Sequence, residues 1–366
     1  MDIHDIAIAA AIAKGKGGGS GGGYTKAETD ALLNEKQDNL TSAQLAAVNS
    51  GITAAKVTQY DDIYAVMNYS NLNHNGIFRG KDLTSQWVEG GKTKEGLYTK
   101  VYAGDFSDLY LGDYFTVHID TDLYEIFTGT AFIDGVTYYE QGGTVTDRTY
   151  TATTDTTPDS SKSYYTMRTV SEDIDLMIAG FNYYYNTGDT VLYKPHLVLI
   201  PRLFGFATAA KMNETNTTTG GYLNSYMHQT VLPCYADSLR TALNNHLLSH
   251  RTILSNAVNT STPSMAGAGM TGAASGWEWT TVELQLMNEV QVYGTTVWSS
   301  SAYDVGVDNR QLPAFKFINP IQISRAHFWL RSVVSSTGFA YCTNTGVAAN
   351  DGASSAYYVR PLILFG

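Results

Sequence analysis

From residue 77 onward the sequence is a succession of short apolar or aromatic runs divided by Asp, Gly and polar tracts. Runs of this kind are typical of β-strands, whereas one longer segment, residues 237–258, has the apolar spacing of a helix. On that helix we expect Leu239, Leu243, Leu247 and Ile253 to share a side. The fold class predicted is α+β, mostly β. Strands are expected within residues 109–119, 123–129, 132–140, 177–186, 196–203, 277–286 and 289–298, and from 328 to the end.

Composition supports a β-rich protein with polar loops. Charged residues make up 16% of the chain and hydrophobic residues 43%, so polarity comes largely from Thr, Ser, Asn, Gly and 26 Tyr. Tyr with Ser, Gly and Asn is also the mixture found in antibody binding sites, although Tyr pairing across strands explains part of the excess. The net charge of −11 disfavours nucleic acid and an electrostatic membrane anchor as partners.

Three further features bear on where the protein resides. No apolar run approaches the roughly 20 residues of a membrane-spanning helix, so no membrane insertion is expected. Residues 6–13 are apolar but lack the basic start and cleavage site of a signal peptide. Cys234 and Cys342 lie far apart in sequence, and each is expected to be a buried, reduced thiol.

The first part of the chain differs in composition from the rest. A short Ala- and Ile-rich helix is expected over residues 3–14, followed by a Gly-rich linker over 15–23. Thr25 and Glu28 have the spacing of a capping box, and the helix they begin carries apolar residues it cannot bury alone. We therefore expect residues 1–23 to be an attachment helix and linker, and residues 24–76 to be a helical region that forms a homotrimer.

Two sets of motifs resemble a known group of proteins. The string YTKAETDALLNEKQD, from Tyr24, resembles a segment that recurs in phage tail fibres. A second set occurs in a fixed order: LGDYFTV, IAGFNYYYNTGD, PHLVLIP, GGYLNSYM, LLSHRTILSNAV, LMNEVQVYG, FWLRSV and YVRPLILFG. This order, from about residue 112 to the end, resembles the C-type-lectin-like domains of phage tail proteins. It also resembles the variable proteins of diversity-generating retroelements.

The resemblance implies a β-rich middle domain or insertion over residues 77–175 and a lectin-like ligand-binding domain over 176–366. It also implies that the last strands display the binding residues between fixed framework positions. Residues 333–358 contain few large apolar side chains, so much of this stretch is expected to face water. The candidate ligand-binding residues are Ser335, Ser336, Phe339, Tyr341, Thr343, Asn344, Asn350, Asp351, Ser354, Ser355 and Tyr357, with Ser299, Ser300 and Tyr303 as weaker candidates.

The framework positions are Trp329, Arg331 and Arg360. Trp329 and Arg331 belong to a strand with a buried face, and Arg331 is expected to bind backbone carbonyls or a carboxylate beneath the loops. Residues 359–361 are expected to form the matching closing strand, followed by apolar filling residues.

No catalytic residues, metal ligands or cofactor are assigned. His246 and His250 are four residues apart on the predicted helix, but no third ligand and no metalloprotease Glu accompany them. Asn350 and Asp351 lack the companion carboxylates of a calcium-dependent sugar site. Glu289 is a lone acid, whereas glycosidases need a convergent pair.

The function expected is that of a phage tail tip adhesin, not an enzyme, which recognises a host-cell surface receptor, protein or glycan. It would be made in the host bacterial cytoplasm, reside in the virion, and join other tail proteins through its N-terminus. Diversification of its C-terminal residues by a retroelement is a hypothesis. The alternatives are a bacterial or prophage-derived surface lectin-like protein that binds glycans, and a tail-associated glycan hydrolase.

Overall fold

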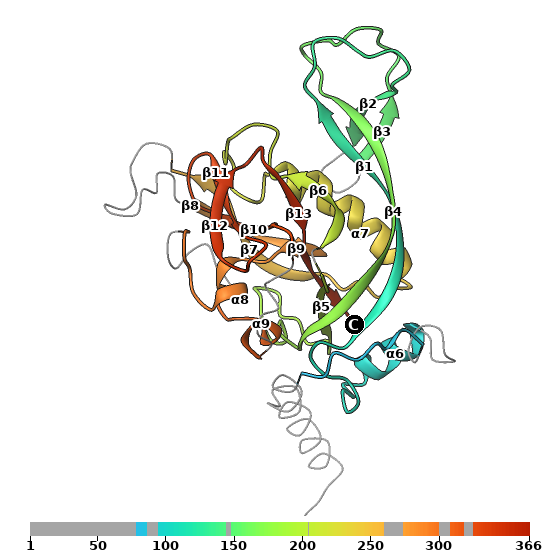
Figure 1. The fold of residues 1–366 in the computed structure, drawn as a ribbon, viewed down its shortest axis with the longest axis vertical. Helices are drawn as coiled ribbons and strands as arrows, with labels where there is room; N and C mark the ends of the chain where they lie inside the picture. Colours follow the sequence, from blue (N-terminus) through green and yellow to red (C-terminus); the bar gives the residue numbers. More distant parts are fainter. Residues whose placement is uncertain are drawn as a thin grey trace, which may run out of the picture. The chain divides into compact units, whose positions relative to one another are not determined.

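The computed structural model describes residues 78–85, 94–143, 148–203, 205–259, 274–299, 308–317 and 325–366 (Figure 1). All of them belong to one unit of the chain, Met67–Gly366. The attachment helix, linker and trimerisation helices expected in residues 1–76 lie outside the described residues. The described part is mostly β, as expected. Its helices are α6 (Lys94–Tyr102), the π-helical turn η2 (Met227–Val231), α7 (Leu232–Ala242), α8 (Glu289–Tyr293) and α9 (Pro313–Phe317).

The largest sheet has the strand order β3-β2-β4-β5-β14-β9, with β1 paired to β4. Strands β1 and β4 form a long antiparallel ribbon without a register shift, from Tyr114 opposite Met177 to Phe127 opposite Tyr164. In Figure 1 the far end of this ribbon, with β2 and β3, extends beyond the other strands. The strands are β1 (Tyr114–Phe127), β2 (Tyr138–Gly143), β3 (Arg148–Ala152), β4 (Tyr164–Phe181), β5 (Leu197–Pro201), β9 (Leu284–Leu286) and β14 (Pro361–Phe365).

A second, five-stranded sheet carries the C-terminal motifs and has the order β12-β11-β10-β13-β6. All six residues of β10 are buried, because apolar side chains cover both faces of this central strand. Phe328 packs into one hydrophobic cluster and Trp329 into the other. The strands are β6 (Phe206–Lys211), β10 (Phe328–Val333), β11 (Gly338–Cys342), β12 (Ala348–Gly352) and β13 (Ala356–Val359).

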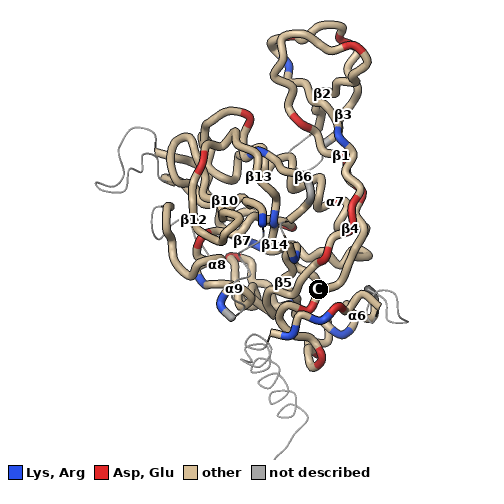
Figure 2. The backbone as a smooth tube through the Cα atoms, viewed as in Figure 1, with Lys and Arg blue, Asp and Glu red and all other residues tan. Residues whose placement is uncertain are grey.

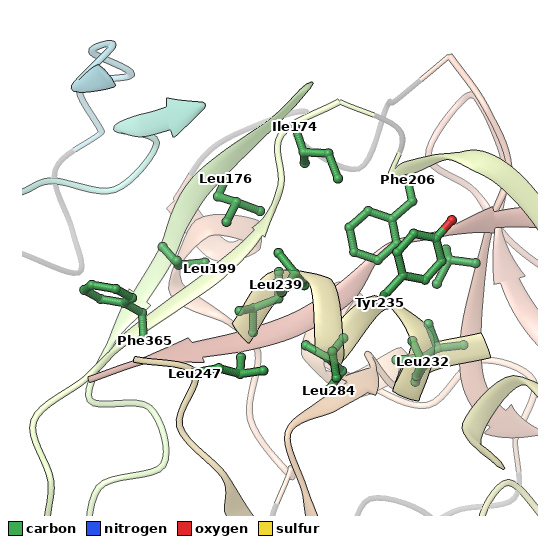
Figure 3. Close-up of a cluster of buried hydrophobic side chains, with 14 of the residues drawn as sticks. Ile174, Leu176, Leu199, Phe206, Leu232, Tyr235, Leu239, Leu247, Leu284 and Phe365 are labelled. Carbon is green, nitrogen blue, oxygen red and sulfur yellow. The ribbon is translucent and has the colours of Figure 1, made fainter. Parts of the chain in front are cut away.

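The main core lies where α7 packs against the large sheet (Figure 3). Leu232, Tyr235 and Leu239 project from α7 toward Leu176 of β4 and Phe206 of β6. Tyr235 stacks on Phe206 with ring centroids 3.9 Å apart. Each fully buried Leu of this cluster contributes roughly 1.5–3 kcal/mol to folding by leaving water. The cluster therefore anchors the helix on the sheet.

The helix predicted over residues 237–258 is wrong beyond Ala242. α7 ends at Ala242, and Asn244 and Asn245 follow with φ of 52° and 63°. Asn tolerates this left-handed conformation better than most residues, and it stops the helix. The chain then forms β7 (His250–Val258), which pairs with β8 (Ala274–Val282).

The strand predicted over residues 289–298 is also wrong. Its first half is helix α8, which begins at a complete capping box: the Asn288 side chain accepts from the Gln291 N–H, and the Gln291 side chain accepts from the Asn288 N–H. The helix ends at Gly294 in the left-handed conformation.

Other expectations hold with shifted limits. Strands occur within residues 196–203, 277–286 and from 328 onward. The runs at 109–119 and 123–129 belong to the single strand β1, because the Asp and Thr residues between them continue the alternation instead of turning. The expected closing strand over 359–361 is divided: β13 ends at Val359 and β14 starts at Pro361 in the other sheet. The expected domain boundary between residues 175 and 176 lies inside β4.

Candidate ligand-binding surface

The five-stranded sheet places three of the candidate residues on one face. Tyr341 lies opposite Trp329 on one side and Ala349 on the other. Asp351 lies two positions beyond Ala349, so it has the same orientation. Tyr357 shares this face as well, since its neighbour Tyr358 pairs with Phe328, whose side chain points to the other face.

Four aromatic rings meet at this face. Trp329 is fully buried, and its indole N–H donates to the Ala210 carbonyl oxygen at 2.9 Å. The half-buried Tyr357 lies 4.7 Å from Trp329 and 4.4 Å from Tyr341, measured between ring centroids. His327, also half-buried, lies 5.4 Å from Tyr341 and 5.2 Å from Tyr357. We call His327, Tyr341 and Tyr357, resting on Trp329, the aromatic patch.

Polar groups border the aromatic patch and fix its rings. The Tyr357 hydroxyl donates a 2.6 Å hydrogen bond to Oδ2 of Asp351. Partial burial opposes ionisation of Asp351, but the bonds from Tyr357, from the Gly352 N–H and from Ser355 outweigh it and lower the pKa of Asp351. Burial and the same bond raise the pKa of Tyr357. The carboxylate is thus ionised and the phenol protonated at neutral pH.

The turn that joins β11 to β12 lies beside the histidine of the patch. The N–H of Asn344 donates to Nδ1 of His327 at 3.1 Å, and the Thr343 hydroxyl accepts from the Val347 N–H at 2.9 Å. Asn344 is exposed and Thr343 is half-buried. Asn344 is therefore available to a ligand resting on the aromatic patch, whereas Thr343 mainly shapes the turn.

The remaining serines lie near the other end of β11, where Gly338 pairs with Gly352. The carbonyl of Ser335 accepts from the Thr218 hydroxyl at 2.7 Å, and the carbonyl of Ser336 accepts from the Thr218 N–H. Ser354 donates both its N–H and its hydroxyl to Oδ1 of Asn216. These contacts attach Ser335, Ser336 and Ser354 to residues 216–218, away from the aromatic patch. Ser355 instead bonds to Asp351 at the border of the patch. Asn350 is exposed but pairs with Ala340, which places it on the opposite face of the sheet.

Two candidates prove to be structural. Phe339 lies on the same face of β11 as Tyr341, but two residues along the strand, where the main hydrophobic cluster buries it fully. Ser299 is buried, and its hydroxyl donates to Oε2 of Glu289 at 2.7 Å. Glu289 also accepts from the N–H groups of residues 297–299, so this carboxylate holds the chain that follows α8. Ser300 and Tyr303 lie outside the described residues.

His327 was missed by the sequence analysis. His327 directly precedes the strand motif FWLRSV. The only sequence evidence for the face to which its side chain points is its position two residues before Trp329. Its neighbours Tyr341 and Tyr357 come from β11 and β13, so only the strand register shows that the three rings meet.

The framework residues lie beneath the surface. Arg331 forms an ion pair with Asp308 in which both side chains are fully buried, with Nη2 and Oδ2 2.7 Å apart. Of the two kinds of partner expected for Arg331, backbone carbonyls or a carboxylate, the structure shows the carboxylate. Arg360, also fully buried, donates to the carbonyls of Pro201 at 2.9 Å and Arg202 at 3.1 Å. Burial lowers the pKa of Arg360 to about 10. Arg360 thus fixes the point where the chain passes from β13 to β14.

The histidines that were considered as a metal pair lie apart. His246 follows α7 and stacks on Tyr98, with centroids 3.5 Å apart. His250 begins β7 and is buried beside Tyr184 and Gln285. Within the described residues, no group of three or more His, Cys, Asp or Glu side chains has the arrangement of a metal site. No helix in the same residues is long and apolar enough to cross a membrane.

One surface group has the connectivity of a hydrolase triad. His118 Nδ1 lies 2.8 Å from Asp173, and His118 Nε2 lies 3.3 Å from the Ser171 hydroxyl. Asp120 also lies 3.3 Å from Nε2, and it competes with Ser171 for that nitrogen. All four side chains come from the outer face of the β1–β4 ribbon, where His118 is 55% exposed and Asp173 72% exposed. A nucleophile needs a water-poor site with oxyanion donors, so we interpret this group as a solvated surface network.

Comparison with protein-family models, curated proteins and solved structures finds no match to this chain.

Proposed function

We propose that this chain is a receptor-binding protein of a phage tail and that the aromatic patch is its ligand-binding surface. The observation that carries the binding role is the packing of the half-buried Tyr341 and Tyr357 against each other and against the buried Trp329, with the ionised Asp351 beside them. The assignment to a phage tail rests on the motif resemblance of the N-terminal and C-terminal segments. A lectin-like fold for residues 176–366 belongs to the same proposal.

The patch has the properties of a recognition surface. Two Tyr rings offer a large amphipathic area and lose little side-chain entropy on binding, because their contacts with Trp329 and with each other already restrict them. Asp351 and Asn344 supply an acceptor and a donor at the border. A sugar ring could stack on the Tyr rings while its hydroxyls bond to these groups, and a protein loop could insert an apolar side chain in the same place.

Trimerisation through residues 24–76 completes the proposal. Three patches displayed on one particle raise the effective concentration on a repetitive cell surface, so the affinity of each patch need not be high. Light scattering of the purified chain tests this step. A trimer is expected, and a monomer at micromolar concentration would contradict it.

The phage assignment is tested by mass spectrometry of purified virions and by sequencing the DNA that flanks the gene. Detection of the chain in virions beside tail genes supports it. A neighbouring reverse transcriptase gene with a near-copy of the 3′ end, altered at adenines, would add diversification of the binding residues. Absence from virions and from any tail gene cluster would overturn the assignment and favour the surface lectin.

Treating the target cells before the binding assay shows whether the receptor is a glycan or a protein. Periodate oxidation of cell-surface sugars abolishes binding to a glycan, whereas protease treatment abolishes binding to a protein. A glycan hydrolase is distinguished by the release of reducing ends from host wall polysaccharide, which the present proposal does not expect.

A further inference from the structure

Strand β1 has one edge that β4 does not cover. At the start of the strand, the N–H of Tyr114 donates to the Lys81 carbonyl at 3.0 Å, and the N–H of Thr116 donates to the Thr84 hydroxyl at 3.0 Å. Both N–H groups therefore point away from β4. Outward-directed groups recur at every second residue of an antiparallel strand, so the even-numbered residues of β1 form the open edge.

The middle of this edge has no hydrogen-bonding partner in the described part of the chain. Within it, the outward N–H and C=O groups of His118, Asp120 and Asp122 form no backbone or side-chain hydrogen bond. Beyond them the Tyr124 carbonyl accepts from the Tyr226 hydroxyl, which closes the edge again. About three consecutive outward positions are thus available, enough to pair with an extended segment of roughly five residues.

The open edge forms one wall of a pocket of about 530 Å³. Helix α7 supplies the opposite wall with Cys234, Asp237 and Ser238. The Thr121 hydroxyl donates to the Cys234 carbonyl at 2.8 Å and holds the two walls together. The pocket is therefore a groove that runs between a strand edge and a helix, which is the geometry used for strand addition.

Charge selects the occupant of this groove. Three carboxylates line it, from Asp120, Asp122 and Asp237, and no Lys or Arg is among its lining residues. Figure 2 marks acidic positions along the ribbon that carries this edge. Arg240 binds Asp237 at 2.7 Å, and His118 lies 3.3 Å from Asp120, whereas Asp122 bonds only to the Thr169 hydroxyl. The pKa of His118 is raised, chiefly by its hydrogen bond with Asp173.

We propose that an extended, basic segment of a partner protein binds in this groove as an additional strand beside β1. Its backbone pairs with the outward groups of His118, Asp120 and Asp122, and its Lys or Arg side chains, at alternate positions, meet Asp120 and Asp122. The groove repels an acidic segment, and a neutral segment gains no ion pair in it. The groove therefore discriminates between partners by charge. The inference rests on the open strand edge and on the acidic lining of the groove, and it is independent of the receptor-binding role proposed for the aromatic patch.

The test is selection of a random linear peptide library, displayed on filamentous phage, against the full chain. Enrichment of sequences with Lys or Arg at alternate positions is expected. Synthetic copies of these peptides are then titrated against the wild type, Asp120→Ala and Asp120→Pro. The N–H of Asp120 points outward, so Pro at this position removes a docking donor without removing a bond to β4.

Affinity is expected to fall about threefold in Asp120→Ala, which loses the charge only, and about tenfold or more in Asp120→Pro, which also loses the N–H. Methylation of alternate backbone nitrogens of the peptide should abolish its binding to the wild-type protein. This part of the test requires no protein variant. Bound peptide should also slow alkylation of the groove residue Cys234. Failure to enrich basic alternating peptides, or equal binding by the methylated peptide, would overturn the proposal.

Discussion

The hydroxyl of Tyr357 donates a 2.6 Å hydrogen bond to the carboxylate of Asp351, and both residues border the face that we propose as the binding surface. The bond joins β13 to β12 across the five-stranded sheet. It fixes the direction of the Tyr357 ring, which in turn contacts Tyr341 and Trp329. Orientation of the patch thus depends on one charge-assisted contact.

Replacing Tyr357 with Phe removes this hydrogen bond and keeps the ring. The carboxylate loses a donor, so the pKa of Asp351 should rise toward its ordinary value of 3.8. Because the folded-state pKa of Asp351 is lowered, its stabilisation is present above the unfolded pKa and is lost as the pH falls through the folded pKa. Urea unfolding should therefore show a loss of about 1 kcal/mol or less near neutral pH. That difference should disappear in acid. If the Asp351 carboxyl titrates in Tyr357→Phe as it does in the wild type, measured by NMR, this role of Tyr357 is contradicted. Tyr193→Phe is the control.

The buried ion pair of Arg331 and Asp308 predicts a large asymmetry between single and double variants. Arg331→Met leaves an unpaired buried carboxylate and should cost about 3–5 kcal/mol in urea unfolding. Combining it with Asp308→Leu should recover much of this loss. The exposed pair of Arg168 and Glu125 is the matched control, and Arg168→Met should cost less than about 1 kcal/mol. Equal effects at the two arginines would contradict the burial of the Arg331 pair.

Two buried histidines predict a loss of stability in acid. Burial lowers the pKa of His250 to about 3 and that of His196 to about 4, from an ordinary value of 6.5. The unfolded chain therefore binds these protons first. Stability is full above pH 6.5 and falls as the pH drops toward the folded values, by up to about 1.4 kcal/mol per pH unit for each histidine.

His250→Gln should remove roughly half of this pH dependence between pH 6.5 and 4, measured by thermal unfolding. His118→Gln is the control, because His118 is exposed and its pKa is raised. Its contribution has the opposite sign: it is present below the unfolded pKa and is lost as the pH rises. A His250→Gln profile parallel to the wild type would show that His250 titrates normally.

The two thiols should react at very different rates. Cys342 is buried, and burial raises its pKa to about 11 although a hydrogen bond with Tyr293 opposes the rise. Cys234 is only half-buried, contrary to the sequence expectation. At pH 8 a thiol reagent should modify one cysteine per folded chain quickly, and Cys234→Ser should abolish that fast phase. A fast phase that survives in Cys234→Ser would mean that Cys342 is accessible.

The sequence predicted well where the side-chain pattern had one structural solution. The apolar run at β5 and the run FWLRSV at β10 are strands, as predicted, although β10 is buried on both faces and was expected to have one buried face. It failed where local polar residues overrode the apolar spacing. The left-handed Asn244 and Asn245 divide a helical pattern, and the spacing of Asn288 and Gln291 was a capping signal that could have identified α8.

The candidate site could be predicted only in part, for a related reason. The abundance of Tyr and Asn after residue 334 indicated the segment that contains Tyr341 and Tyr357 of the aromatic patch. Register brings Tyr341 and Tyr357 together on one face of the sheet. Phe339 shares this face, and only the packing around its end of β11 buries it while Tyr341 is only half-buried. His327 joins the two Tyr rings through pairing between strands that are distant in sequence, which no local pattern encodes.

The most direct test of the account is binding of the fluorescently labelled full chain to a panel of bacterial strains. On the strains that the wild type binds, Tyr341→Ala and Tyr357→Ala are each predicted to reduce binding at least about tenfold, since each removes a central ring of the patch. Tyr193 lies outside the aromatic patch and is 64% exposed, so Tyr193→Ala should bind like the wild type. Full binding by the two patch variants, or an equal loss in Tyr193→Ala, would contradict the assignment of the aromatic patch as the receptor-binding surface.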